Sequence, residues 1–308
     1  MSEVMQFLQI TFKPMVLIFT LSNLFAMGLQ VKMPNVIAEL KNKKGMVLIF
    51  VWGWVLGPAL CYLITRIFPL AEPFVIVILI SSVAPCAPFF PPMVVKAKGD
   101  INFAGAFYPL VVVGAVVFIP LMAPLIIKGL AVSPLVLAKP LFLTLLLPLA
   151  IGAAVRHYAG TLATMISPTV IKIAKIATLV MLAQCVAIYT RPMLATAGSF
   201  ALLSGTVFIV VMGVITYRFG FGLKQNQRSV MALGMGTRNF AAVFAAVLTV
   251  PNLDPLVITM IVMWVLWSIV LSAVAARILG KQALAALITS KGGADIEQPV
   301  PLSEKNNE

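Results

Sequence analysis

Long apolar runs dominate the sequence, each close to the roughly 20 residues that an α-helix needs to cross a bilayer. A soluble protein of 308 residues needs a charged surface around its core, whereas only 10% of these residues are charged. We therefore predict an all-α, polytopic membrane protein with about nine transmembrane helices. The spans are expected at residues 14–31, 45–65, 73–94, 101–127, 137–155, 169–189, 200–221, 228–250 and 255–279.

The basic residues predict the orientation of these spans. The net charge of +13 comes mainly from Lys and Arg in short loops, so it indicates topology and not a nucleic-acid-binding face. Sixteen of these residues fall on one side and five on the other, which predicts a multi-pass protein of the cytoplasmic (inner) membrane with its N-terminus outside and its C-terminus in the cytoplasm. The sixteen are Lys32, Lys41, Lys43, Lys44, Lys96, Lys98, Arg156, Lys172, Lys175, Arg218, Lys224, Arg228, Arg277, Lys281, Lys291 and Lys305, and the five are Lys13, Arg66, Lys128, Lys139 and Arg191.

Two of the nine spans are predicted to be broken helices. The third contains SSVAPCAPFFPPMVVKAKGD (residues 81–100), and the eighth contains ALGMGTRNFAAVFAAV (residues 232–247). Their prolines, glycines and polar residues unwind the backbone. The two spans cross the membrane in opposite directions because they are an odd number of spans apart, as inverted repeats require. Interrupted helices in matching positions of two halves indicate a binding site.

The expected domain organisation follows from these repeats. We predict one transmembrane domain over residues 1–280, with inverted repeats at roughly 14–127 and 137–279, and no second domain. The sequence turns polar after Gly280, which predicts a short interfacial stretch and then a disordered cytoplasmic tail within 281–308. No cleaved signal is expected, because the first residues lack a basic stretch followed by a short apolar core and a cleavage site.

Arg238 is the most informative single residue. An Arg near the centre of a span costs at least about 2.5 kcal/mol on insertion scales and needs a partner. All nine acidic residues lie in predicted loops, ends or tail, so the remaining partners are unwound backbone carbonyls or an anionic substrate. The alternative is that the span is misplaced and Arg238 extends to the interface. Beside it, Asn239 either bonds a substrate or satisfies loosened backbone.

The other candidate substrate-binding residues are Thr237, Pro85, Cys86 and Tyr108, which lie at the breaks or where a transport path could run. Cys86 has the alternative role of a small buried hydrophobic residue, and the three cysteines form neither a disulfide pattern nor a zinc motif. No motif of a protease, a lipase or an ATP-driven pump is present, so the chain is not predicted to be an enzyme.

Three segments carry a resemblance to a known family. They are LFAMGLQVKMPNVIAELKNKKGMVLIFVWGWVLGPAL, APCAPFFPPMVVKAKGD and GMGTRNFAAVFAA, and in this order and spacing they resemble the bile acid:sodium symporter family of the BART superfamily. The likeness covers most of residues 20–279. It implies a panel domain, a core domain whose two broken helices cross at mid-membrane, and transport of organic anions, with the first helix of a ten-helix layout absent.

The sequence departs from this family at the positions that match its sodium ligands. Hydroxyl, amide and carboxylate side chains are replaced there, although sodium requires several oxygen donors. The residues at these positions are Gly53, Phe90, Pro91, Ala104, Tyr108, Gly234 and Arg238. The resemblance implies coupling to sodium, whereas these residues predict no metal site and no cofactor. Our hypothesis is that the Arg238 guanidinium occupies the ion region, either as a fixed cation replacing sodium or as the partner of a substrate carboxylate.

The function expected from these features is transport of a small organic anion across the lipid bilayer by alternating access. A first alternative is a sodium-independent facilitator or exporter of a metalloid oxyanion, since the related arsenite permeases place a Cys in a comparable broken helix. The others are an intramembrane enzyme and a sensor that binds without transport.

Overall fold

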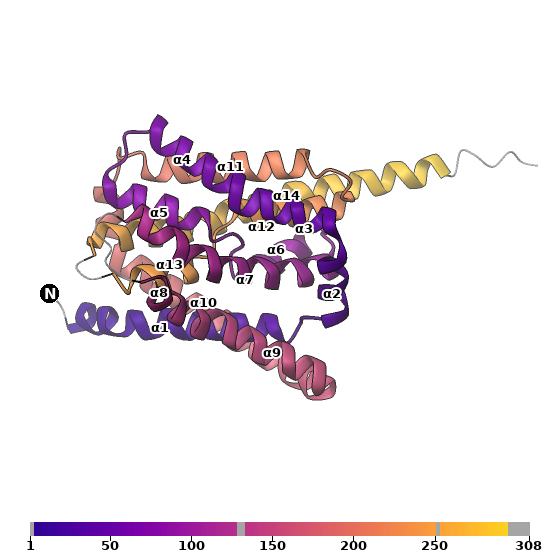
Figure 1. Ribbon diagram of the computed structural model, residues 1–308, viewed down its shortest axis with the longest axis horizontal. Coiled ribbons are helices and arrows are strands. Elements are labelled where there is room, and N and C mark those ends of the chain that lie inside the picture. Colours follow the sequence, from indigo (N-terminus) through magenta and orange to yellow (C-terminus); the bar gives the residue numbers. More distant parts are fainter. Residues whose placement is uncertain (1–2, 128–132, 251–252, 295–308) are drawn as a thin grey trace, which may run out of the picture.

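The computed structural model describes residues 3–127, 133–250 and 253–294, and within these ranges the chain is helical and contains no sheet (Figure 1). The helices follow one another through short connections. In chain order the elements are α1 (Glu3–Gly28), α2 (Met33–Lys41), α3 (Lys43–Phe50), the π-helical η1 (Val51–Leu56), α4 (Gly57–Ile67), α5 (Glu72–Ser82), α6 (Phe90–Lys96), α7 (Ile101–Ile126), α8 (Pro134–Leu141), the π-helical η2 (Phe142–Leu146), α9 (Leu147–Tyr158), α10 (Gly160–Ala195), α11 (Ala201–Arg218), α12 (Gln225–Gly236), α13 (Phe240–Val247) and α14 (Pro255–Ala294).

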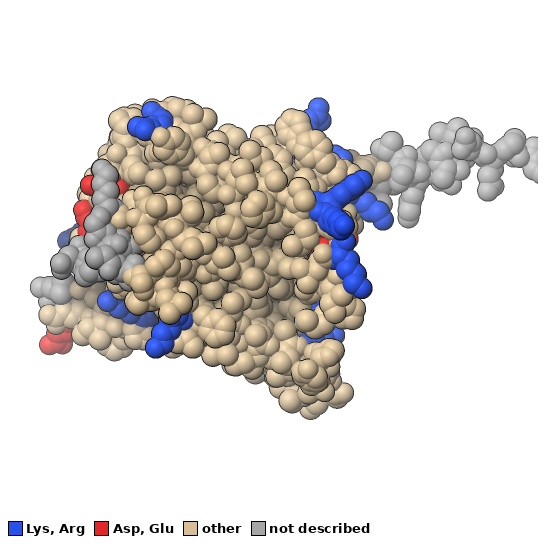
Figure 2. Space-filling model, viewed as in Figure 1, with Lys and Arg blue, Asp and Glu red and all other residues tan. Residues whose placement is uncertain are grey.

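The lengths and surface of these helices are those of a polytopic membrane protein. Seven helical segments of the described chain are long and apolar enough to cross a bilayer, counting α3–η1–α4 and α8–η2–α9 as one each. The other two predicted spans are the two expected to be broken, and each is divided into short helices, α5 with α6 and α12 with α13. Figure 2 shows Lys and Arg gathered toward the two ends of the visible face, with a broad uncharged band between them.

The largest differences from the predicted spans are at helix ends. α1 begins at Glu3 and not at residue 14, and α10 covers Gly160–Ala195 where residues 169–189 were expected. α14 continues to Ala294, so the first part of the polar stretch after Gly280 is helical. Residues after Gly280 are rich in Ala, Leu, Lys and Gln, which favour helix although they are not apolar enough to signal a span. Residues 295–308, with Lys305, and Lys128 lie outside the described residues.

The helices form two groups (Figure 1). In the first, α1 packs along α9 and α10, and η2 also contacts α1. In the second, the broken pairs α5/α6 and α12/α13 pack with α4, α7, α11 and α14. These groups are the panel and the core that the family resemblance implies. α8 contacts both α7 and α13, so it lies where the panel meets the core.

A pair of glycines sets the spacing inside the panel. Gly28 of α1 and Gly152 of α9 are in direct contact: a Cβ atom on Gly28 would lie 2.8 Å from the Cα of Gly152, and one on Gly152 would lie 2.9 Å from the Cα of Gly28. Small residues at helix crossings let two backbones approach closely in a membrane. The pair therefore holds α1 against α9.

We expect Gly152→Val to destabilise the protein by roughly 1–3 kcal/mol, because the new side chain must push α1 and α9 apart. The measurement is the melting temperature of the purified protein in detergent. Gly105→Ala is the matched control, since a Cβ at Gly105 meets nothing within 4 Å. Equal melting temperatures for the two variants would show that the spacing of α1 and α9 is not fixed by this contact.

Candidate functional site

The two broken spans cross and pair with each other through their backbones. The N–H of Cys86 donates to the carbonyl of Thr237 at 3.0 Å, and the N–H of Asn239 donates to the carbonyl of Ala84 at 2.8 Å. These bonds form an isolated antiparallel bridge between Pro85 and Arg238. The crossing arises locally, because Pro85 and Pro88 disfavour helical backbone in the residues before them. The pairing satisfies the backbone groups that the breaks release.

Besides Pro85 and Arg238, three of the predicted site residues lie at this crossing. The Thr237 hydroxyl donates to the Leu233 carbonyl at 2.8 Å and accepts from the Ala87 N–H at 3.2 Å. The Asn239 Oδ1 accepts from the Ala242 N–H at 3.2 Å and so caps the start of α13. Cys86 is fully buried and has a φ of 70°, a left-handed conformation that the bridge imposes on a residue with a side chain.

Arg238 lies inside the protein and not at the interface. Its side chain is 1% exposed, so the alternative in which it extends to the membrane surface is wrong. Nη1 donates to the Ser82 carbonyl at 3.1 Å, Nη2 donates to the Met235 carbonyl, and the guanidinium carbon lies 4.4 Å from the centroid of the Phe208 ring. Nε has no hydrogen-bond partner among the described residues.

The two carbonyls that Arg238 binds belong to the last turns of two half-helices. Ser82 ends α5, and Met235 is the penultimate residue of α12. A helix carries a partial negative charge at its C-terminal end, and here both ends converge inside the core. The guanidinium therefore neutralises two converging helix ends and satisfies their free carbonyls. Sequence reasoning left backbone carbonyls and an anionic substrate as the two possible partners of Arg238, and it did not identify Phe208.

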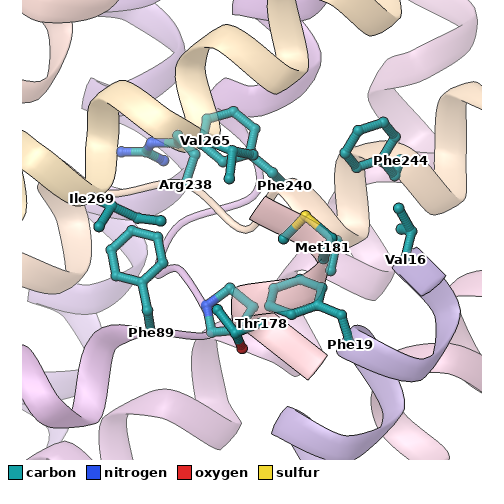
Figure 3. A pocket seen from close by; sticks show the side chains of 12 residues that line it. Val16, Phe19, Phe89, Thr178, Met181, Arg238, Phe240, Phe244, Val265 and Ile269 are labelled. Atoms are coloured by element: carbon teal, nitrogen blue, oxygen red, sulfur yellow. The ribbon is translucent and has the colours of Figure 1, made fainter. Parts of the chain in front are cut away.

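A small cavity separates the panel from the core next to this crossing (Figure 3). We call it the central cavity; its volume of about 20 Å³ has room for about one water molecule, so the panel and the core are closed against each other. Figure 3 shows the Arg238 nitrogens directed away from Met181 and Phe244 of the cavity wall. The central cavity is lined by Val16, Phe19, Pro88, Phe89, Thr178, Met181, Arg238, Phe240, Ala241, Phe244, Val265 and Ile269.

Aromatic rings fill the core around several of the positions that match sodium ligands. The Phe90 ring lies 5.7 Å from the ring of Phe107 and 6.2 Å from that of Tyr108, with which it is stacked. Phe107 lies against Gly234, where a Cβ atom would be 2.6 Å from the Phe107 Cζ. Tyr108 is fully buried and its hydroxyl has no partner among the described residues. Phe107 was not identified from the sequence.

The remaining positions of that set lie elsewhere around the crossing. Gly53, in η1, faces Pro85 and Met235. A Cβ atom added at Gly53 would lie 3.6 Å from the nearest side-chain atom of each of these two residues. Ala104 is buried in α7, whereas Pro91 lines a separate crevice between panel and core. The predicted residues are therefore divided between the crossing, an aromatic cluster and the panel–core boundary.

Two larger crevices flank the central cavity along α1 and α10. The first, the Lys13 crevice, measures about 600 Å³ and is lined by Gln9, Phe12, Lys13, Tyr189, Leu256 and Thr259 among others. The second, the Lys175 crevice, measures about 360 Å³ and is lined by Asn23, Gln30, Pro88, Phe89, Lys175 and Thr178 among others. α1 and α10 thus face a succession of crevice, cavity and crevice.

Comparison with known proteins agrees with this architecture. The model of the family described as "Sodium Bile acid symporter family" matches residues 15–196, more than half of the chain. A search of curated proteins found no match. That family consists of membrane transporters. The long apolar helices and the paired broken helices of this chain agree with such a family. The chain belongs to the sodium bile acid symporter family.

Proposed function

We propose that the protein moves an organic anion across the cytoplasmic membrane by alternating access, with no coupling to sodium. The observation that carries this proposal is the position of Arg238 between the C-terminal ends of α5 and α12. A cation is favourable where two helix ends of negative partial charge meet. In this chain that cation is a covalently attached guanidinium, so the crossing needs no bound ion.

The aromatic cluster supports the same proposal. The Phe90 ring packs against the rings of Phe107 and Tyr108, and Phe107 lies against Gly234. The single side-chain oxygen that these four residues provide is the Tyr108 hydroxyl. Sodium binding requires several oxygen ligands, and this cluster provides only one. Two of the carbonyls at the crossing are already bound by Arg238.

The electrostatics of the central cavity favour an anion as the transported substrate. Phe240 and Ala241, the first residues of α13, line the cavity, and a helix N-terminus carries a partial positive charge. The two crevices contain Lys13 and Lys175 and no acidic residue among those that line them. Since the Arg238 guanidinium is bound to the carbonyls of Ser82 and Met235, we assign it the role of resident cation and not that of substrate partner.

The metalloid alternative has less support. It would use the Cys86 thiol, but Cys86 is fully buried and lines neither the central cavity nor the two crevices. The crevices have volumes suited to a small organic molecule, for which pockets of about 300–1,000 Å³ are usual. The structure therefore favours an organic anion.

The melting temperature of the purified protein is expected to be the same in sodium chloride and in choline chloride at equal ionic strength. If the protein had a sodium site, a sodium concentration of 100 times its Kd would stabilise the folded state by about 2.7 kcal/mol. A stabilisation of this size is readily detected as a rise in melting temperature. Uptake of labelled taurocholate into proteoliposomes is likewise expected to proceed equally with either cation outside. A saturable, sodium-specific rise in melting temperature would contradict the proposal.

A further inference from the structure

The Lys175 crevice contains one charged side chain. α10 has 36 residues, about 54 Å of helix, and Lys175 is near its middle. Thr178, three residues or about 4.5 Å further along the helix, lines both this crevice and the central cavity. A lysine on a membrane-spanning helix requires access to water or an anionic partner. Lys175 is exposed, and no hydrogen bond or ion pair of its side chain with the described residues is seen.

The rest of the Lys175 crevice suits an anion with an apolar body. Phe89, Pro91 and Pro92 form an apolar wall on the core side, whereas Asn23, Gln30 and Thr178 provide polar groups on the panel side. Asn23 donates to the Thr178 hydroxyl at 3.1 Å and so fixes both beside the lysine. Pro88 and Phe89 also line the central cavity, so a molecule in this crevice contacts the boundary that must open for transport.

The Lys13 crevice has the same composition on the opposite side of the central cavity. Among the described residues that line it, Lys13 is the single charged one, with Gln9 and Thr259 as polar neighbours and apolar residues over most of the remaining wall. Phe12 closes it toward the central cavity, with its ring 6.1 Å from that of Phe244 and 5.4 Å from that of Tyr189. Each route to the centre therefore has one lysine.

We propose that Lys13 and Lys175 are the specificity-determining residues that bind the anionic group of the substrate, Lys13 in one crevice and Lys175 in the other. The proposal rests on the proposed function and deepens it by assigning the two side chains that hold the anionic group of the transported molecule. Each ammonium binds the anionic group while the apolar body packs against the crevice wall.

Charge removal and chemical restoration at Lys175 test this assignment. The probe is taurocholate, a sulfonated amphipathic anion, and its Kd is measured on the purified protein in lipid nanodiscs. We expect Lys175→Cys to raise the Kd at least about tenfold, because a charge-assisted hydrogen bond is lost. Aminoethyl methanethiosulfonate, which attaches an ammonium group, should restore most of the affinity, whereas the sulfonatoethyl reagent should not. Native Cys61, Cys86 and Cys185 are buried, which limits background modification.

Lys172→Cys is the matched control, because Lys172 is exposed on the same helix, three residues away, and does not line the crevice. Its Kd should stay within about twofold of the wild-type value, as for an isolated surface charge.

In sealed vesicles, Lys13→Cys should be modified by the impermeant sulfonatoethyl reagent from the side opposite to that for Lys175→Cys. Equal Kd values for Lys175→Cys and Lys172→Cys, or equal effects of the two reagents, would overturn the assignment. Wild-type protein that neither binds nor transports taurocholate would instead contradict the proposed function.

Discussion

Replacement of Arg238 by Gln is expected to reduce taurocholate transport at least about tenfold and to lower the melting temperature. Gln can donate to one of the two carbonyls at the crossing but carries no charge, so the C-terminal ends of α5 and α12 would face each other without compensation. A buried carbonyl that loses its partner costs roughly 1–3 kcal/mol, and about 1.4 kcal/mol corresponds to a factor of ten. The measurements are the initial rate of uptake into proteoliposomes and the melting temperature of the purified protein.

Three comparisons separate the charge of Arg238 from its packing. Arg238→Lys keeps the charge but not the forked guanidinium, so it should retain part of the activity. Arg218→Gln removes an exposed arginine at the end of α11 and should change stability by less than about 0.5 kcal/mol. Sodium should not rescue Arg238→Gln, because Phe90, Ala104 and Gly234 still provide no side-chain oxygen. Transport by Arg238→Gln at the wild-type rate would remove the role of resident cation.

The breaks could be predicted from the sequence because their causes are local. Pro85 and Pro88 disfavour helix whatever surrounds them. The Arg238–Asn239 pair interrupts an apolar run, and exposure of the charged Arg238 side chain to lipid would cost free energy. The choice between a carbonyl partner and a substrate partner for Arg238 depended on where Ser82 of another span lies. That position is a property of the packing, so the sequence left both possibilities open.

Other features of the site depend on long-range packing. Phe107 and Phe208 are ordinary apolar residues in their own helices, and only the fold places one against Gly234 and the other under the Arg238 guanidinium. The position of Lys175 along its helix was likewise not predicted from the sequence. Its charge assigned it to the cytoplasmic end of span 169–189, whereas α10 extends to Gly160 and leaves Lys175 near the middle of the helix, beside a crevice.

Enlargement of Gly234 is expected to cause a large loss of stability. A Cβ atom there would lie 2.6 Å from the Cζ of Phe107, whose ring is held by Phe90 on one side and by Phe103, at 6.2 Å between ring centroids, on another. Gly234→Leu should therefore cost about 3 kcal/mol or more, since a ring confined in this way cannot move aside. The measurement is the melting temperature, for which each kcal/mol corresponds to roughly 2–4 °C in a chain somewhat smaller than this one.

A double-mutant cycle with Phe107 tests whether this contact is the cause. Phe107→Ala alone leaves a cavity and should cost about 3–5 kcal/mol, but Gly234→Leu with Phe107→Ala should cost less than the sum of the two, because the leucine occupies the vacated space. Gly213→Ala on α11 is the control, with 3.8 Å between its added Cβ and the Ala232 carbonyl. If Gly234→Leu were tolerated as well as Gly213→Ala, the Phe107 ring would be free to move. The aromatic cluster could then open to an ion, and the argument that this core has no room for sodium would fail together with the predicted destabilisation.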